Sequence, residues 1–387
     1  MRGVLRLARR RLFHAWKQNL ILCFALALAF FVPLASTLVS KGFETKLRSR
    51  SERVPLVLGA RGNRFDLTLA VLSHRDLALP PLERREADEL AKDGRAYVIP
   101  VGRRFRARGK AIVATTPDYF ELMGASVERG TLPIQLGDCV LGAHVASQLA
   151  LDVGARVFSD PTELYDLSKP PALEMLVTGV LRENGTADDD AVFVDIKTDW
   201  LLAGLFHGHE DARAIDEKLV MAEQDGERVL SKAVLEYQKV TDDNRDAFHI
   251  HGDPGKLPIS AAIVVPTDDK QRTILEARLQ NSRTLQLLEP RDVIEELLDY
   301  VFGIKALVDG LALLIGISTV LLVGLVLSLT LRLRAAETRS LGRIGVARGT
   351  IVRLWCLEHG AIVLAALGLA VLATWLVLAW VPAALSL

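Results

Sequence analysis

The sequence predicts a membrane protein with three transmembrane α-helices and a large α+β extracytoplasmic domain between the first helix and the second. Charged residues make up 24% of the 387 residues, as in an ordinary soluble domain. Half of the residues are nevertheless hydrophobic, and the mean hydropathy is +0.26. These values are compatible only if the apolar residues are concentrated in a few segments.

Three long uncharged segments hold these apolar residues, at 18–40, 310–331 and 360–387. About 20 residues suffice for an α-helix to cross the ~30 Å hydrocarbon layer of a bilayer. The last segment, even with its lead-in from Leu354, is too short for two spans. We therefore predict transmembrane helices at 18–40, 303–331 and 354–381, followed by a short tail at 382–387.

A cleaved signal peptide is the alternative for the first segment, because a basic segment precedes it. Its apolar run is longer than that of a typical signal peptide, and no Ala-x-Ala motif closes it. These two features favour a membrane-spanning helix.

Two strongly basic segments predict the orientation of the spans. Residues 1–17 carry six Lys and Arg and no acid, and residues 332–353 carry six Arg against Glu337 alone. Segments rich in Lys and Arg beside a span are typically cytoplasmic, so residues 41–302 and the C-terminus are predicted on the outer side. Apolar residues at helical spacing within 1–17 also predict a basic amphipathic helix at the membrane surface.

The net charge of zero is therefore a sum over compartments. Basic cytoplasmic segments are balanced by an acidic extracytoplasmic domain, since Lys+Arg and Asp+Glu are both 47. A nucleic-acid-binding protein needs a basic face, so no nucleic-acid partner is expected.

Residues 41–302 mix strand and helix patterns without regular βαβ alternation, which predicts an α+β domain. Strands are expected at 54–60, 96–101, 111–115, 138–141, 175–181, 191–194 and 261–265. Helices are expected at 118–123, 144–151, 268–280 and 291–300. Two lobes are expected, with residues of about 140–250 inserted into a domain that the flanks form.

The residues of this domain show no catalytic signature. It has neither a phosphate-binding loop nor a Gly-x-Ser-x-Gly elbow, and its single cysteine, Cys139, cannot form an internal disulfide. We predict a non-catalytic chain with no cofactor of its own. Asp188, Asp189 and Asp190 follow an Asn-Gly turn and are expected to form a solvated turn.

Two His-x-His motifs are the candidate metal ligands of the sequence. They are His207 with His209, and His249 with His251. Alternate residues of an extended segment point the same way, so each pair can offer two imidazoles to one ion such as zinc. The competing interpretation is a solvated loop, because His-x-His often arises by chance.

The second span carries two further features. Lys305 and Asp309 are spaced i,i+4 near its outer end and are expected to form an ion pair. Gly316, Gly324 and Ser328 are small residues at which a second helix can approach closely, so the seam of a dimer is expected along this span.

Taken together, these features resemble the MacB/FtsX-type permeases of bacterial ABC transporters, also called type VII or mechanotransmission permeases. The resemblance covers essentially the whole chain, with loose motifs. In the domain its matching residues are 115–120, 140–142, 149–154, 177–181, 184–186 and 190–194. In the basic loop they are 337–339 and 343–348, and Glu358 matches an acid that commonly opens the next span.

The resemblance implies a permease dimer, made of two copies or of two homologous chains, bound to a dimeric ABC ATPase that holds ATP and magnesium. The loop 332–353 would contain the coupling helix that docks on the ATPase. Its expected contact residues are Glu337, Arg339, Leu341, Arg343, Ile344, Gly345, Val346 and Arg348. The resemblance also implies the bacterial inner membrane, a cytoplasmic N-terminus, a periplasmic C-terminus and a periplasmic protein or lipoprotein partner.

The implied function is export or extraction of a lipoprotein, peptide, lipid or drug-like molecule on the periplasmic side, driven by the partner ATPase. An FtsX-like role, in which the domain signals to a periplasmic enzyme, is the first alternative. A zinc-related transport system is the second, suggested by the His-x-His motifs. The family usually has a fourth span, so a three-span variant is expected here.

Overall fold

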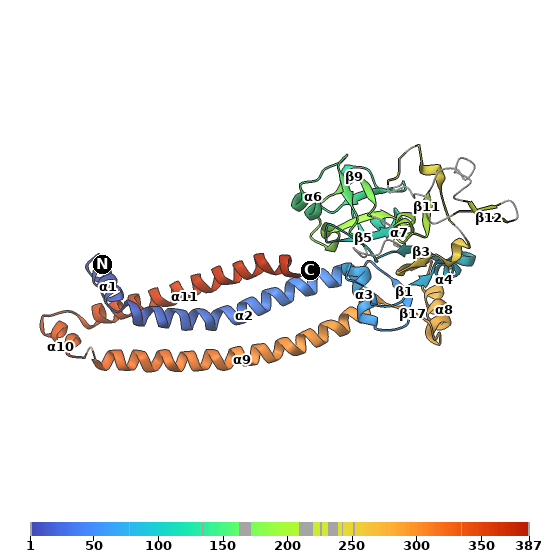
Figure 1. The fold of residues 1–387 in the computed structure, drawn as a ribbon. Coiled ribbons are helices and arrows are strands. Elements are labelled where there is room, and N and C mark those ends of the chain that lie inside the picture. The colour runs from blue at the N-terminus through green and yellow to red at the C-terminus, as the bar shows by residue number, and fades with distance from the viewer. Residues whose placement is uncertain are drawn as a thin grey trace. The chain divides into compact units, whose positions relative to one another are not determined.

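The computed structural model describes residues 2–76, 78–133, 135–161, 172–208, 220–224, 227–230, 239–241, 243–250, 252–333 and 335–385. The chain divides into two compact units (Figure 1). Unit 1 comprises Met1–Thr45 and Leu298–Leu387, and unit 2 comprises Lys46–Leu297. Three helices in the described part are long and apolar enough to cross a membrane, and the mixed α/β unit 2 lies in sequence between the first and the second of them.

Unit 1 is helical. Its elements are α1 (Arg2–His14), α2 (Trp16–Ser51), α9 (Pro290–Leu333), α10 (Ala335–Arg343) and α11 (Arg348–Leu385), of which α2 and α9 also extend into unit 2. Helix α1 packs against α11. The chain turns from α1 into α2 at an elbow, where the Asn19 side chain donates a hydrogen bond to the Leu12 carbonyl over 3.0 Å.

Apolar side chains pack the first span against the third. Leu26 and Ala27 of α2 are buried against Ile362 and Ala366 of α11. Buried surface is scarce elsewhere on the spans, as expected for helices whose outer surface faces lipid. Apolar side chains that would be costly in water are therefore favourable in a bilayer.

The predicted ion pair of the second span is confirmed, because Lys305 and Asp309 are hydrogen-bonded one turn apart on α9. At Gly316 and Gly324 a Cβ atom would meet open space, and Ser328 is exposed. These positions leave room for another helix, and the dimer seam along α9 stays a prediction.

Unit 2 contains a four-stranded antiparallel sheet in the order β17-β1-β16-β3 among its described residues. The strands are β1 (Leu56–Ala60), β3 (Ala96–Val101), β16 (Ala261–Pro266) and β17 (Leu285–Leu288). Helices α3 (Arg64–Ser73), α4 (Arg84–Ala91) and α8 (Asp269–Gln280) pack on this sheet. Strand β1 is buried on both faces, which explains its unbroken apolar sequence.

The second sheet of unit 2 has seven strands in the described part of the chain, along the path β4-β5-β10-β7-β9-β6 with β8 on β9. They are β4 (Arg106–Ala107), β5 (Lys110–Thr115), β6 (Val127–Gly130), β7 (Asp138–Leu141), β8 (Arg156–Phe158), β9 (Glu174–Leu181) and β10 (Ala191–Asp195). Helices α5 (Asp118–Met123), α6 (Ala143–Leu149) and α7 (Ile196–Leu202) accompany it. The sheet is mixed, since β5–β10 and β7–β9 pair in parallel.

This sheet begins at Arg106, before the start at about residue 140 that the sequence suggested for an inserted lobe. The reason is the partner of β5, which is β10. Local pattern shows that 110–115 is a strand, but it holds no information on whether the strand joins the first sheet or the second.

Three short ribbons complete the described strands. They are β2 (Leu82–Glu83) with β15 (Pro258–Ile259), β11 (Phe206–Gly208) with β14 (Phe248–Ile250), and β12 (Val220–Gln224) with β13 (Glu227–Leu230). Short 3-10 turns are η1 (Lys92–Gly94), η2 (Ala187–Asp190), η4 (Arg245–Ala247) and η5 (Pro254–Lys256). One continuous apolar core joins both sheets of unit 2.

Candidate functional site: a buried polar network around Asp188

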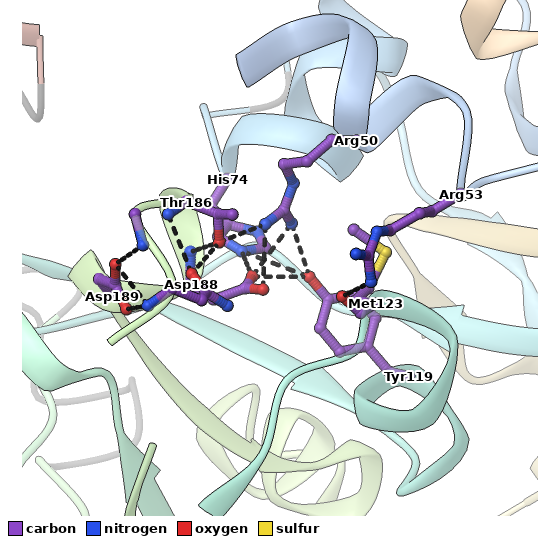
Figure 2. A network of polar contacts seen from close by, with 10 residues as sticks. Arg50, Arg53, His74, Tyr119, Met123, Thr186, Asp188 and Asp189 are labelled. Atoms are coloured by element: carbon purple, nitrogen blue, oxygen red, sulfur yellow. Dashed lines mark hydrogen bonds and ion pairs between the residues drawn. The ribbon is translucent and has the colours of Figure 1, made fainter. Parts of the chain in front are cut away.

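A cluster of polar side chains that contact one another lies in unit 2 (Figure 2). We call Arg50, His74, Tyr119, Thr186 and Asp188 the Asp188 network. The side chains of Arg50 and Asp188 are 6% and 1% exposed, and that of His74 is 3% exposed. Burying a charge is costly unless it is paired and hydrogen-bonded, so the partners of Asp188 decide whether the network is stable.

Four separate elements supply these side chains. Arg50 lies in the last turn of α2, and Tyr119 in the first turn of α5. Asp188 lies in the 3-10 turn η2, whose N-cap is Thr186. His74 is the C-cap of α3 and has a left-handed backbone with φ of 53°, which is uncommon for a residue other than glycine. The network therefore joins segments that lie far apart in the sequence.

Asp188 receives hydrogen bonds from three side chains. Its Oδ1 atom is 3.0 Å from Arg50 Nη2, 2.9 Å from the Tyr119 hydroxyl and 2.8 Å from His74 Nε2. Its Oδ2 atom lies 3.0 Å from Arg50 Nη1.

The Arg50 guanidinium also donates to two neutral oxygens. It lies 2.9 Å from the Thr186 hydroxyl and 2.9 Å from the Tyr119 hydroxyl. The guanidinium thus contacts both carboxylate oxygens, with a hydrogen bond from Nη2 to Oδ1 and an ion-pair contact from Nη1 to Oδ2. Asp188 thus holds the end of α2 against α5 and η2.

Burial and pairing set the protonation states of the network. Although burial opposes ionisation, Arg50 and the His74 hydrogen bond lower the pKa of Asp188 far below its ordinary value, so it is a carboxylate. Burial lowers the pKa of His74, although the bond to Asp188 opposes this shift. Burial and the nearby Asp188 raise the pKa of Tyr119, so its hydroxyl keeps its proton. The network is one ion pair bonded by two neutral donors.

The tautomer of His74 follows from the same geometry. Because Nε2 faces a carboxylate oxygen, it carries the proton and donates it. The other nitrogen, Nδ1, is buried and has no hydrogen-bond partner among the described residues. A charged imidazolium would bury an unpaired N–H there, so the neutral ring is favoured.

The prediction that Asp188, Asp189 and Asp190 form a solvated turn is wrong for the first two. Asp188 and Asp189 are each 1% exposed. Asp189 accepts hydrogen bonds from the backbone N–H groups of Asn184 and Gly185, and so closes its own loop. An Asn-Gly turn followed by acids looks solvent-facing in sequence, because the donors that satisfy Asp188 come from other elements.

A second layer of contacts fixes His74. The Arg103 side chain donates from Nε to the His74 carbonyl over 2.7 Å, and its guanidinium lies 3.0 Å from Asp76. The Arg103 backbone N–H donates to the Ser260 hydroxyl over 2.9 Å. The left-handed backbone of His74 is therefore held from outside the network as well.

A close backbone contact supports η2 from the other side. A Cβ atom on Gly142, the N-cap of α6, would lie only 2.2 Å from the Asp188 carbonyl and 2.4 Å from the Asp189 carbonyl. We predict that Gly142→Ala lowers the free energy of unfolding by about 1–3 kcal/mol, because η2 must move. Thermal unfolding of the full chain in detergent, with Gln148→Ala on the exposed face of α6 as control, measures the loss. Equal stability of both variants would contradict this.

The Asp188 network is suited to fixing structure rather than to catalysis. The Oδ1 atom of its carboxylate accepts three hydrogen bonds, its phenol and imidazole are neutral, and each of these side chains is buried. A general base or nucleophile needs access to a substrate, which this site does not offer.

The four candidate metal ligands lie outside this network. Strands β11 and β14 place His207 and His249 directly opposite each other in register. His209 and His251 lie outside the described residues. In the described part of the chain, no group of three or more His, Cys, Asp or Glu has an arrangement that could hold a metal.

The candidate coupling residues lie on α10 and in the turn that follows it, except Arg348, which is the first residue of α11. Ile344 is 76% exposed, and Arg339, Arg343 and Arg348 are exposed as well. Gly345 has φ of 87°, a left-handed conformation that ends α10 and leads to α11. The side chains of Glu337 and Leu341 lie outside the described set, and Val346 is half-buried.

Comparison with known proteins finds similar solved structures, three of which are particularly informative in their descriptions. No family model matches the sequence, and no curated protein matches it. The periplasmic region of MacB from Actinobacillus actinomycetemcomitans has 12% identity and a TM-score of 0.37, covering 64% of this chain and 95% of that one. The extracellular domain of the noncanonic ABC-type transporter YknZ from Gram-positive bacteria has 10% identity and a TM-score of 0.33, covering 60% and 98%.

The third structure is a domain from a protein of Porphyromonas gingivalis described as a permease. It has 11% identity and a TM-score of 0.29, and the match covers 62% of this chain and 91% of that chain.

Proposed function

We propose that this chain is the membrane subunit of an ATP-driven transport complex, in which a separate ATPase binds the loop 332–353. The carrying observation is the exposed Ile344 on a basic loop between two apolar helices. The chain itself would be non-catalytic, and ATP and magnesium would be bound by the partner. Loop and N-terminus would lie in the cytoplasm, and unit 2 would lie on the outer side of the inner membrane.

The chemistry of the loop supports docking of a protein. An apolar side chain exposed among charged ones is typical of an anchor that fills a pocket on a partner. Arg343 and Arg348 flank Ile344 and are exposed, so they can meet an acidic rim. A loop that only fixed the membrane orientation would need the arginines but not the isoleucine.

The proposal also concerns how a movement driven by the ATPase would be transmitted to unit 2. Helix α2 carries both the first apolar segment and, in its last turn, Arg50 of the Asp188 network. A displacement of α2 would therefore act on unit 2 through a buried ion pair rather than through a loose linker. The substrate would be handled on the outer side, by export or extraction of a lipoprotein, peptide, lipid or drug-like molecule.

The proposal predicts that an ATPase co-purifies with the full chain from native membranes. Ile344→Glu combined with Arg343→Glu should reduce the co-purified ATPase at least tenfold, as expected when an interface anchor worth ~1.4 kcal/mol or more is removed. The amount of partner chain and the ATP hydrolysis rate of the purified complex are the measurements. Ile274→Glu, at an exposed isoleucine of α8 in unit 2, is the matched control and should retain the partner.

Two outcomes would contradict the proposal. One is a wild-type chain that purifies from its native membranes without an ATPase. The other is a double variant that retains the wild-type amount of ATPase while its elution volume in detergent is unchanged.

A metal-related role is the second candidate function, because the β11–β14 register favours it.

A further inference from the structure

Helix α1 packs one of its faces on the spans of unit 1. Ala8 and Arg11 are buried, at 6% and 9% exposed. Leu12 packs against the apolar cluster that joins α2 and α11, and α1 as a whole contacts α11. Residues three or four positions apart share one face of a helix, so these three side chains mark the face that α1 turns towards the spans. The apolar side of this basic helix is therefore used for packing on protein.

The opposite face of α1 combines arginines with a large aromatic side chain. Arg6, Arg9 and Arg10 are exposed, and the Phe13 side chain is 72% exposed. These four residues follow one another at spacings of three or four, so they lie on one side of the helix. We call them the arginine face.

No acidic residue balances the arginine face in its own part of the chain. The sequence contains no Asp or Glu before Glu44. Among the side chains that the structure describes, none forms an ion pair with Arg6, Arg9 or Arg10. The positive charge of this face is therefore available to an anionic partner.

Contacts at the elbow between α1 and α2 place the arginine face beside the start of the first span. The Asn19 side chain donates to the Leu12 carbonyl over 3.0 Å, so this turn of α1 lies level with the beginning of α2. Leu12 also packs against the cluster that contains Leu26, which belongs to the apolar segment of α2. The headgroup layer on each side of the hydrocarbon is roughly 5–8 Å thick. A helix packed on the first turns of a span therefore lies in or next to that layer.

The residues at the elbow have the composition of a membrane interface. Trp16 is 55% exposed, and the Lys17 ammonium lies 5.8 Å from the centroid of its ring. Tryptophan is enriched where a span leaves the hydrocarbon, and a lysine there keeps its charge among the headgroups.

We propose that the arginine face of α1 binds the headgroups of anionic phospholipids and prefers them to zwitterionic headgroups. A guanidinium donates paired hydrogen bonds to phosphate oxygens, and the negative surface of an anionic leaflet attracts each basic side chain near it. Phe13 can enter the boundary between headgroups and acyl chains beside the arginines. An acidic protein is the competing occupant, and the position of α1 beside the first turns of the span favours lipid. The proposal needs the membrane location of α2 but not the docking of an ATPase.

The test uses the fluorescence of Trp16 in the full chain, reconstituted in phosphatidylcholine bilayers. The bilayers contain the same mole fraction of either brominated phosphatidylglycerol or brominated phosphatidylcholine as quencher. The chain has five Trp, so the Trp16 signal is the difference between the wild type and Trp16→Phe. Quenching by the anionic lipid should be at least about twofold greater, since one basic side chain near the surface favours an anionic lipid about fivefold. Raising the salt concentration from about 0.1 M to about 1 M should remove this difference, because the Debye length falls from ~10 Å to ~3 Å.

The triple variant Arg6→Gln/Arg9→Gln/Arg10→Gln should be quenched equally by the two lipids at low salt. Glutamine is nearly as good a helix former as arginine, so α1 keeps its structure while the charge is lost.

The matched control removes the same charge from unit 2. It is Arg75→Gln/Arg182→Gln/Arg283→Gln, at three exposed arginines, and it should keep the wild-type preference for the anionic lipid.

Three results would overturn the proposal. They are equal quenching of wild-type Trp16 by both lipids at low salt, an unchanged preference in the α1 triple variant, and loss of the preference in the control. If the α1 triple variant loses the co-purified ATPase but keeps its lipid preference, the arginine face binds a protein instead. Loss of the lipid preference with the ATPase retained supports the lipid site, so failure of this inference and failure of the proposed function are distinguishable.

Discussion

Replacing Asp188 by alanine is expected to lower the free energy of unfolding of unit 2 by about 3–5 kcal/mol, which is typical of breaking a buried ion pair. The substitution leaves the Arg50 guanidinium buried opposite no charge. Burial of Arg50 is nearly complete, with 6% of its side chain exposed, so water cannot replace the carboxylate. Tyr119 and His74 each lose the oxygen that accepts their proton.

Chemical unfolding of the full chain in detergent, followed by the fluorescence of the buried Trp200, measures this loss. Asp190→Ala is the matched control in the same 3-10 turn. Its side chain is 27% exposed and pairs with Lys110, whose side chain is 18% exposed, over 3.3 Å. We expect a smaller loss there, of about 1 kcal/mol, because this pair is only half-buried and water still reaches it. Equal losses in the two variants would show that the charge at Asp188 has no special role.

A double variant separates the charge from the shape of the site. Removing one partner leaves the other charge buried and unpaired. Replacing both partners by apolar residues of similar volume often leaves the free energy of unfolding unchanged. Arg50→Met/Asp188→Leu should therefore recover part of the stability that Asp188→Ala loses. If the double variant is as unstable as the sum of the two single variants, the coupling between Arg50 and Asp188 is absent.

Hydrophobic periodicity and apolar runs predicted which segments are helices and strands. They predicted less well which strands pair with one another. The uncharged segments coincide with helices α2, α9 and α11, because a membrane span needs little information beyond length and hydropathy. Strands such as 96–101 and 261–265 were also predicted, because residues that are buried in a sheet form a recognisable apolar run in the sequence. The order of strands in the two sheets depends on long-range pairing, which one sequence does not show.

Helices α3 and α4 were not predicted from the sequence, for a different reason. Helix α4 is rich in charge and buries only Ala87 and Leu90, so its apolar stripe is too narrow to stand out. Helix α3 is signalled by its N-cap, because Asn63 accepts a hydrogen bond from the Phe65 backbone N–H. That capping signal was present in the sequence and could have located the helix.

The Asp188 network illustrates what sequence reasoning misses at a site. Thr186 and Asp188 look like ordinary turn residues, and Arg50 looks like one of several bases after the first span. Only the fold shows that their side chains meet within 3.0 Å. The His-x-His motifs, in contrast, were visible as candidate ligands, and the structure added the register that joins them.

Acid should destabilise unit 2 through His74, and His74→Asn should remove part of this pH dependence. Burial lowers the folded pKa of His74 below its ordinary value of 6.5, so the folded ring stays neutral while the unfolded ring takes up a proton. Stability from this group is therefore complete above pH 6.5 and is lost as the pH falls towards the folded pKa. The slope is at most ~1.4 kcal/mol per pH unit for one proton.

The measurement is the free energy of unfolding of the full chain in detergent at intervals from pH 8 to pH 5. The slope of this free energy against pH is compared between the wild type and each variant. Asparagine tolerates the left-handed backbone of position 74, so the variant loses the titration without adding much strain. Asp188 acts in a lower window, because its folded pKa is depressed and its contribution is lost only as the pH falls below its ordinary value of 3.8.

His144 provides a control, because its pKa is shifted in the opposite direction to that of His74. Its bonds to Asp190 raise its pKa even though partial burial opposes them, so its contribution is present below pH 6.5 and is lost as the pH rises. His144→Gln should therefore make the acid loss of stability steeper, whereas His74→Asn should make it shallower. Slopes that change in the same direction in both variants would mean that the pH dependence arises elsewhere and that the neutral, buried state assigned to His74 is wrong.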